Sequence, residues 1–188
     1  LEYASAAAEL CGERPDPQWS AVAAGLRIPH FADGTTREHA GYDGEMIKQA
    51  DANLLGYPLG IVTGREAQLR DLEYYERRID PRNGPAMSYS VFAIQYARLG
   101  MAEKACEMFR RSYLPNLRPP FGVFAETATS GNPYFMTGAG GMLQAVLFGF
   151  GGLEITADGL VQRPSVLPPQ WKNLRIKING KIYQATNQ

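Results

Sequence analysis

The sequence lacks an excess of either charge, because its 188 residues contain 19 lysine and arginine residues against 19 aspartate and glutamate residues. Proteins that bind nucleic acid or an anionic membrane surface through charge need a basic patch, for which this composition provides no surplus. No apolar run is long enough to cross a bilayer. We therefore expect no nucleic-acid partner and no membrane, and we expect a ligand that is neutral or small.

Cysteine and histidine are scarce. The two cysteines, Cys11 and Cys106, and the two histidines, His30 and His39, do not have the spacing of metal ligands. We expect both cysteines to be buried free thiols rather than a disulfide framework, and we expect no metal and no cofactor. Cysteine usage leaves the location undecided between cytoplasmic and exported.

An initiator methionine and a leader segment are also missing. The chain begins with Leu1, and residues 1–11 already have helical periodicity. This pattern predicts that the chain starts inside a larger domain, with an N-terminal half of the same protein as its partner.

Hydrophobic periodicity predicts seven helical stretches, at residues 1–11, 17–26, 46–57, 65–79, 85–99, 101–114 and 137–149. Residues 65–79 and 101–114 are amphipathic, which is typical of surface helices. Residues 85–99 and 137–149 are apolar on nearly every side, which indicates interior helices. The alternation predicts a mainly α fold, a two-ringed array of helical hairpins of which about half is present.

The pattern changes after Gly151 and Gly152. Four short runs have β character, at residues 153–156, 160–162, 174–178 and 181–183. Asn179 and Gly180 predict a tight turn between the last two runs. We therefore expect two domains, a partial helical domain at residues 1–151 and the start of a C-terminal β domain at residues 152–188.

Long segments lead into the predicted interior helices, and long loops in compact domains are usually functional. The first carries the polar run Glu38-His39-Ala40-Gly41-Tyr42-Asp43-Gly44-Glu45, and Lys48-Gln49-Ala50-Asp51 follows at the predicted start of a helix. Such a density of hydrogen-bonding groups suits a polyol, whose hydroxyls each need a fixed partner. Helix capping and a solvated Lys48 explain the same residues, so both interpretations stay open.

Glu126 is the single charged residue between Phe121 and Phe135. Because partial burial among aromatic and hydroxyl side chains tunes the pKa of a carboxyl group, Glu126 is a candidate general base. The alternative is an exposed loop glutamate without a catalytic role.

Several ordered motifs together resemble glycoside hydrolase family 65. The runs Glu38-His39-Ala40-Gly41-Tyr42, Lys48-Gln49-Ala50-Asp51 and Leu54-Leu55-Gly56-Tyr57-Pro58 are similar to the central sugar-binding segment of that family. The runs Asp71-Leu72-Glu73-Tyr74-Tyr75-Glu76, Gly84-Pro85-Ala86-Met87-Ser88 and Met136-Thr137-Gly138-Ala139-Gly140-Gly141 resemble most closely its branch of protein-glucosylgalactosylhydroxylysine glucosidases and acid trehalases. The likeness covers nearly the whole chain.

The resemblance implies the second half of an (α/α)6 toroid followed by a short C-terminal β appendage. It implies part of an inverting, exo-acting glycoside hydrolase that cleaves a terminal α-linked glucosyl unit from a disaccharide or glycoconjugate. Glu126 is then the general base, Lys48 and Gln49 bind the glucosyl unit, and we count His39 and Tyr42 of the same segment as substrate-binding.

The resemblance also sets the alternatives. The general acid of the family lies upstream of Leu1, so this chain alone is expected to be inactive. Phosphorylases of the family replace the carboxylate base with a phosphate site that includes a histidine. Since residues 115–136 contain Glu126 and no histidine, hydrolysis is favoured. A disaccharide phosphorylase of the same family and a non-catalytic carbohydrate-binding fragment are the alternatives.

Overall fold

The computed structural model describes residues 1–187, and it is mainly helical with small antiparallel strand pairs. Its helical elements are α1 (Glu2–Leu10), α2 (Pro17–Gly25), the 3-10 turn η1 (Ala52–Leu55), α3 (Arg65–Glu76), α4 (Ala86–Arg98), α5 (Ala102–Arg111), the 3-10 turn η2 (Leu114–Asn116), α6 (Met136–Gln144) and the π-helix η3 (Ala145–Phe150). Its strands are β1 (Leu117–Arg118), β2 (Val123–Phe124), β3 (Leu153–Thr156), β4 (Gly159–Gln162), β5 (Asn173–Ile178) and β6 (Lys181–Thr186). Within residues 1–187 no helix is both long and apolar enough to span a membrane.

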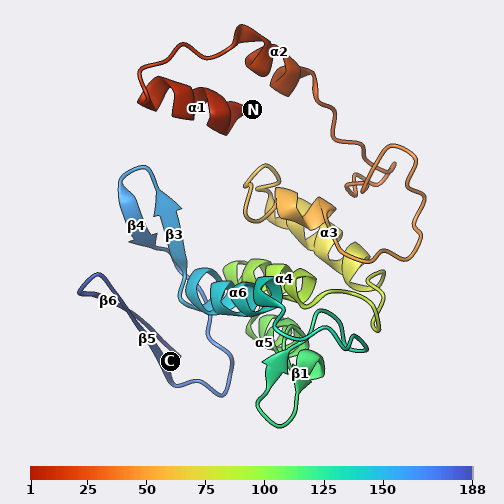
Figure 1. Cartoon of the computed structure of the whole chain (residues 1–188), viewed down its shortest axis with the longest axis vertical. Helices are drawn as coiled ribbons and strands as arrows, with labels where there is room; N and C mark the ends of the chain where they lie inside the picture. Colours follow the sequence, from red (N-terminus) through yellow and green to blue (C-terminus); the bar gives the residue numbers. More distant parts are fainter. Residues whose placement is uncertain (188) are drawn as a thin grey trace.

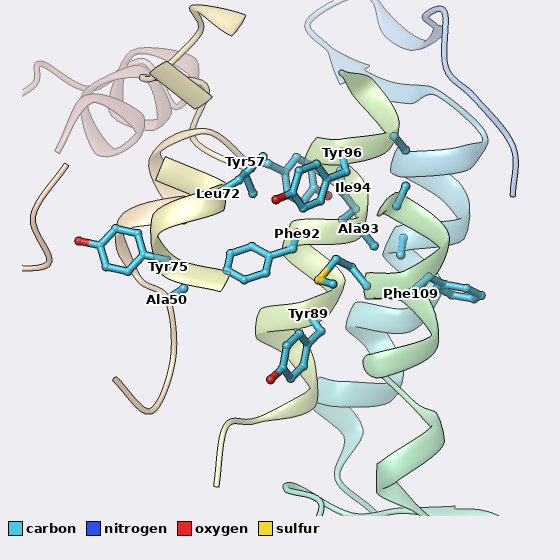
Figure 2. Close-up of a cluster of buried hydrophobic side chains, with 14 of the residues drawn as sticks. Ala50, Tyr57, Leu72, Tyr75, Tyr89, Phe92, Ala93, Ile94, Tyr96 and Phe109 are labelled. Atoms are coloured by element: carbon cyan, nitrogen blue, oxygen red, sulfur yellow. The ribbon is translucent and has the colours of Figure 1, made fainter. Parts of the chain in front are cut away.

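Helix α4 forms the centre of the fold, with α3, α5, α6 and η3 packed against it (Figure 1). Ten of its thirteen residues are buried, because its sequence is apolar or uncharged on nearly every side. Phe92 projects from α4 toward α3, the helix that carries Leu72 and Tyr75, and Ile94 and Tyr96 lie further along α4 in the same core (Figure 2). The structure thus confirms the predicted interior helix at residues 85–99.

Helices α3 and α5 cover this centre and keep one polar face each. In α5, Ala105, Met108 and Phe109 are buried, whereas Lys104 points outward to Glu76 of α3 at 2.6 Å. Both predicted amphipathic helices are therefore confirmed.

The helix predicted at residues 46–57 is wrong. Only η1 is helical there, because the backbone of Ile47 pairs with a distant segment instead of with its own neighbours. The Ile47 N–H donates to the carbonyl of Arg78 at 2.8 Å, and the Asp80 N–H donates to the carbonyl of Ile47 at 3.0 Å. Lys48 and Gln49 consequently lie in an irregular segment that leads into η1, not at the start of an interior helix.

Two predictions of burial do not hold within this chain. Residues 137–149 are helical, but one side of α6 is not covered by residues 1–187, and Met136 and Leu143 are 77% and 57% exposed. Cys11 is exposed while Cys106 is buried. The exposure of Cys11 follows from its place, because α1 and α2 have no buried residue and lie apart from the central helices (Figure 1).

The four predicted β runs are strands, and they pair as two antiparallel hairpins, β3–β4 and β5–β6. Positive φ angles at Asn179 (48°) and Gly180 (82°) make the tight turn between β5 and β6. Trp171 packs its ring on Phe109 and Phe150, with centroids 5.9 Å and 5.4 Å away. The C-terminal part therefore shares core contacts with α5 and η3.

A buried carboxylate fixes the loop that precedes η1. Asp71 of α3 accepts hydrogen bonds from the N–H and the hydroxyl of Thr36, at 2.9 Å and 2.7 Å. The Tyr75 hydroxyl donates to the carbonyl of the same threonine. Helix α3 thereby positions the segment that carries Glu38 to Tyr42.

Replacing Asp71 with alanine is expected to lower the free energy of unfolding by about 2–4 kcal/mol, because two buried donors of Thr36 lose a charged acceptor. Urea denaturation measures this change. Glu73→Ala on the exposed face of the same helix is the control and should change stability by less than about 0.5 kcal/mol. Equal effects of the two variants would contradict the anchoring role.

Candidate active site

Lys48 and Glu126, 78 residues apart in the sequence, form an ion pair in the structure. The Lys48 Nζ lies 3.1 Å from Glu126 Oε1. The two side chains are 63% and 29% exposed, and an ion pair with this exposure stabilises a fold by at most about 1 kcal/mol. The structure thus brings two of the predicted site residues together in a pair that a ligand can reach and reorganise at low cost.

The main chain around this pair is fixed more firmly than the side chains. The carbonyl of Glu126 accepts the N–H of Ala86, the first residue of α4, at 3.2 Å. On the other side, the bridge between Ile47 and Ile79 holds the residue before Lys48. Gly84 passes so close that a Cβ there would lie 2.4 Å from Ile79 and 3.4 Å from the Lys48 carbonyl, so only glycine fits.

Gln49 lies beside a cavity of about 350 Å³, between the segment around η1 and helices α4 and α6. Its amide donates to Asp51 at 2.9 Å, and Asp51 also lines the cavity. Across the cavity, the Tyr57 hydroxyl donates to Gln144 at 3.1 Å and so joins this segment to α6. The volume is at the lower end of small-molecule sites, which range from about 300 to 1,000 Å³.

His39 and Tyr42 lie in the preceding loop, and neither has a hydrogen bond or ring contact with Lys48 or Glu126 in the part of the chain that the structure describes. His39 is exposed and meets the ring of Tyr42 edge-on at 5.8 Å. Tyr42 is 2% exposed, and its hydroxyl donates to the carbonyl of Glu45. Burial raises the pKa of Tyr42 to about 12, so the hydroxyl remains a donor. In this structure Tyr42 is part of the core beneath His39.

Glu38, which belongs to the motif at residues 38–42, has a structural role. One carboxyl oxygen accepts the N–H of Ala52 at 3.2 Å, whereas the other is buried and has no hydrogen-bond partner among residues 1–187. Burial, assisted by the negative charge of Asp51, raises the pKa of Glu38 to about 7. This carboxyl group ties the first loop to η1.

Residues 1–187 contain no group of three or more histidine, cysteine, aspartate or glutamate side chains that could hold a metal ion. The site itself offers one accessible carboxylate, one ammonium group and nearby amide and hydroxyl groups. Such a set can bind sugar hydroxyls and accept a proton.

Curated proteins resemble most of the chain. It is 48% identical over 176 residues to a kojibiose hydrolase of Mucilaginibacter mallensis, covering 94% of this chain and 26% of that protein. It is 39% identical over 182 residues to a protein-glucosylgalactosylhydroxylysine glucosidase of Danio rerio, covering 94% and 27%. A periplasmic/secreted acid trehalase of Candida glabrata is 35% identical over 172 residues, covering 84% and 14%. The chain thus spans about a quarter of the length of the first two relatives.

Among solved structures, a protein from the human microbiome named as a kojibiose phosphorylase superposes with a TM-score of 0.51. The match has 22% identity and covers 74% of this chain and 20% of that chain. At this identity the likeness concerns the fold alone. No family model matches the sequence.

Replacing Glu38 with glutamine is expected to remove a pH-dependent loss of stability. The folded-state pKa of about 7 is higher than the ordinary value of 4.5, so the carboxyl stabilises the fold below about pH 4.5 and this stability is lost as pH rises through about 7. Glutamine stays neutral at all these pH values. As the pH is raised from about 5 to about 8, the free energy of unfolding of the variant should therefore rise by roughly 1–2 kcal/mol relative to that of the unmodified protein, allowing for partial solvent screening.

Urea denaturation at both pH values provides the measurement, with Glu103→Gln on the exposed surface of α5 as the control. The same difference between Glu38→Gln and the unmodified protein at both pH values would show that this carboxyl does not titrate in the range.

Proposed function

We propose that the chain is one part of a longer enzyme of glycoside hydrolase family 65, which hydrolyses a terminal α-linked glucosyl unit. Its similarity to a kojibiose hydrolase, a glucosidase and an acid trehalase supports this proposal. Kojibiose, an α-linked glucose disaccharide, is the substrate we propose first. Two relatives named as kojibiose hydrolases, 48% and 47% identical, support this choice.

The Lys48–Glu126 pair is the observation that carries the mechanism. An inverting glycosidase needs a carboxylate that takes a proton from water and an acid on the opposite side of the bond that protonates the leaving oxygen. Glu126 is accessible, its main chain is held at the start of α4, and it is the base in this proposal. The acid comes from the part of the enzyme outside this chain.

Lys48 and Gln49 bind the hydroxyls of the glucosyl unit in this proposal. Lys48 offers three donors and is mostly exposed beside Glu126, and Gln49 offers donors and an acceptor at the edge of the cavity. His39 belongs to the same substrate-binding surface, and Tyr42 supports it from the core.

The architecture we propose for the longer enzyme is an (α/α)6 toroid. Residues 1–151 supply its second half, with α4 as an inner helix and α3 and α5 as outer helices, and residues 152–188 begin a C-terminal β domain. The exposed apolar side of α6, with Met136 and Leu143, suits packing against the other half of such a ring.

Phosphorolysis is the second candidate, because the structural neighbour is named as a phosphorylase. The complete protein should be assayed on kojibiose and trehalose, with and without inorganic phosphate. Release of free glucose that phosphate does not accelerate is expected. Glucose 1-phosphate formed in its place would overturn the assignment of Glu126 as base, and binding without turnover would indicate a non-catalytic carbohydrate-binding module.

In the complete enzyme, Glu126→Gln should lower kcat by roughly three orders of magnitude or more, with little change in substrate binding, because the base acts in the transition state. Steady-state kinetics on kojibiose measure kcat, and Glu103→Gln is the control for loss of a surface carboxylate. A Glu126→Gln enzyme with an unchanged kcat would remove this residue from the mechanism.

Lys48→Ala and Gln49→Ala should each lower kcat/KM by roughly ten- to a hundredfold, because a sugar hydroxyl without its partner costs about 1–3 kcal/mol in a desolvated site. Thermal melts should show little loss of stability, since the Lys48 ion pair is exposed. Lys177→Ala in β5 is the matched control. If Lys48→Ala unfolds the protein while the folded fraction keeps its kcat/KM, Lys48 has a structural role instead.

A further inference from the structure

The loop that carries Glu126 is held by one arginine that has no acidic partner among residues 1–187. Arg118 lies on β1, and its two terminal nitrogens contact five main-chain carbonyl oxygens. Nη1 donates to the carbonyls of Pro115 and Leu117, which precede Arg118 in the chain, at 2.8 Å and 3.3 Å. A guanidinium group carries its donors in a rigid planar fork, which lets one side chain face two directions at once.

The other nitrogen of the fork contacts the segment directly after Glu126. Nη2 donates to the carbonyls of Thr127, Ala128 and Ser130, at 3.0, 2.8 and 3.1 Å. Arg118 therefore joins the strand that enters the loop to the segment that leaves Glu126.

Asn116 fixes the same segment from the other direction. Its side chain is 3% exposed, and its amide nitrogen donates to the carbonyls of Ala125 and Glu126, both at 3.0 Å. The main-chain carbonyl of Asn116 accepts the Ala125 N–H at 2.8 Å. With the Ala86 N–H, the Glu126 carbonyl thus receives two donors, one from the loop and one from α4.

We propose that Arg118 and Asn116 are positioning residues that hold Glu126 at the place from which it activates water. The proposal rests on the proposed function, in which Glu126 is the general base. Neither residue is in contact with the Glu126 carboxylate, and both act through the main chain on each side of it. A misplacement of a catalytic group by about 1 Å can cost a hundredfold in rate, so the clamp has a measurable effect on turnover.

The chemistry of the clamp separates positioning from general stability. Lysine keeps the charge of Arg118 and much of its length, but its single ammonium group cannot bridge both sides of the loop as the fork does. Aspartate keeps the shape of Asn116 but directs an anionic oxygen at two carbonyl oxygens. Both substitutions disturb the segment around Glu126 while leaving the enclosed surface of α4 unchanged.

The test uses Arg118→Lys, Arg118→Ala and Asn116→Asp in the complete enzyme, with Arg175→Lys in β5 as the matched control. Arg118→Lys should lower kcat on kojibiose roughly ten- to a hundredfold with little change in KM. Amide hydrogen exchange at residues 125–130 should become faster, while exchange in α4 should not change. Millimolar guanidinium chloride, far below a denaturing concentration, should restore part of the kcat of Arg118→Ala, and it should leave the kcat of Arg175→Lys unchanged.

A normal kcat for Arg118→Lys in an enzyme that Glu126→Gln inactivates would overturn the positioning role. A kcat that falls only in proportion to the unfolded fraction, with no rescue by guanidinium, would also overturn it. If Glu126→Gln retains its kcat, the proposed function has failed, and hydrogen exchange at residues 125–130 then decides alone whether Arg118 orders the loop.

Discussion

Helix α4 is enclosed on nearly every side, and the geometry of the site depends on that enclosure. A helix with ten buried residues cannot rotate or slide without opening the core, so its first turn is a fixed point. The Ala86 N–H at this point holds the carbonyl of Glu126, and the preceding Gly84 lies against Ile79 and Lys48. Two loops that are distant in sequence thus derive their relative position from one helix end.

The side chains at this place are much less constrained than the main chain. Lys48 and Glu126 contact each other at 3.1 Å in a solvent-accessible pair. The carbonyl of Glu126 is held by Ala86 and Asn116, and Ile47, the residue before Lys48, is bridged to Ile79. This division suits the proposed catalytic role, because the backbone sets the place of the Glu126 carboxylate and the loose side chains can exchange their ion pair for contacts with a substrate. The half-buried Glu38 accepts a hydrogen bond from the Ala52 N–H and so fixes the neighbouring segment at the start of η1.

Patterns local in sequence predicted the framework well. Helices α3, α4 and α5 were predicted because their apolar residues recur at helical spacing, and the β5–β6 turn because Asn179-Gly180 favours positive φ angles. The helix at residues 46–57 was not predictable in this way, since long-range hydrogen bonds to residues 78–80 replace those within the segment. Proximity of Lys48 to Glu126 is likewise a tertiary property, which only the family resemblance implied. The clamp by Arg118 had no sequence signal, because its partners are main-chain carbonyls that every residue possesses.

The charges around Glu126 bear on the choice between water and phosphate as the attacking group. Arg118 is close in sequence, but both of its terminal nitrogens are occupied by carbonyl oxygens, so the fork that would suit a phosphate is already committed. Lys48 is the cation that faces the site, and Glu126 is its partner. A phosphate dianion would therefore have to displace the Glu126 carboxylate from Lys48. It would then lie beside that carboxylate, whose negative charge repels it. Water meets neither obstacle, which supports the proposed hydrolysis over the proposed alternative of phosphorolysis.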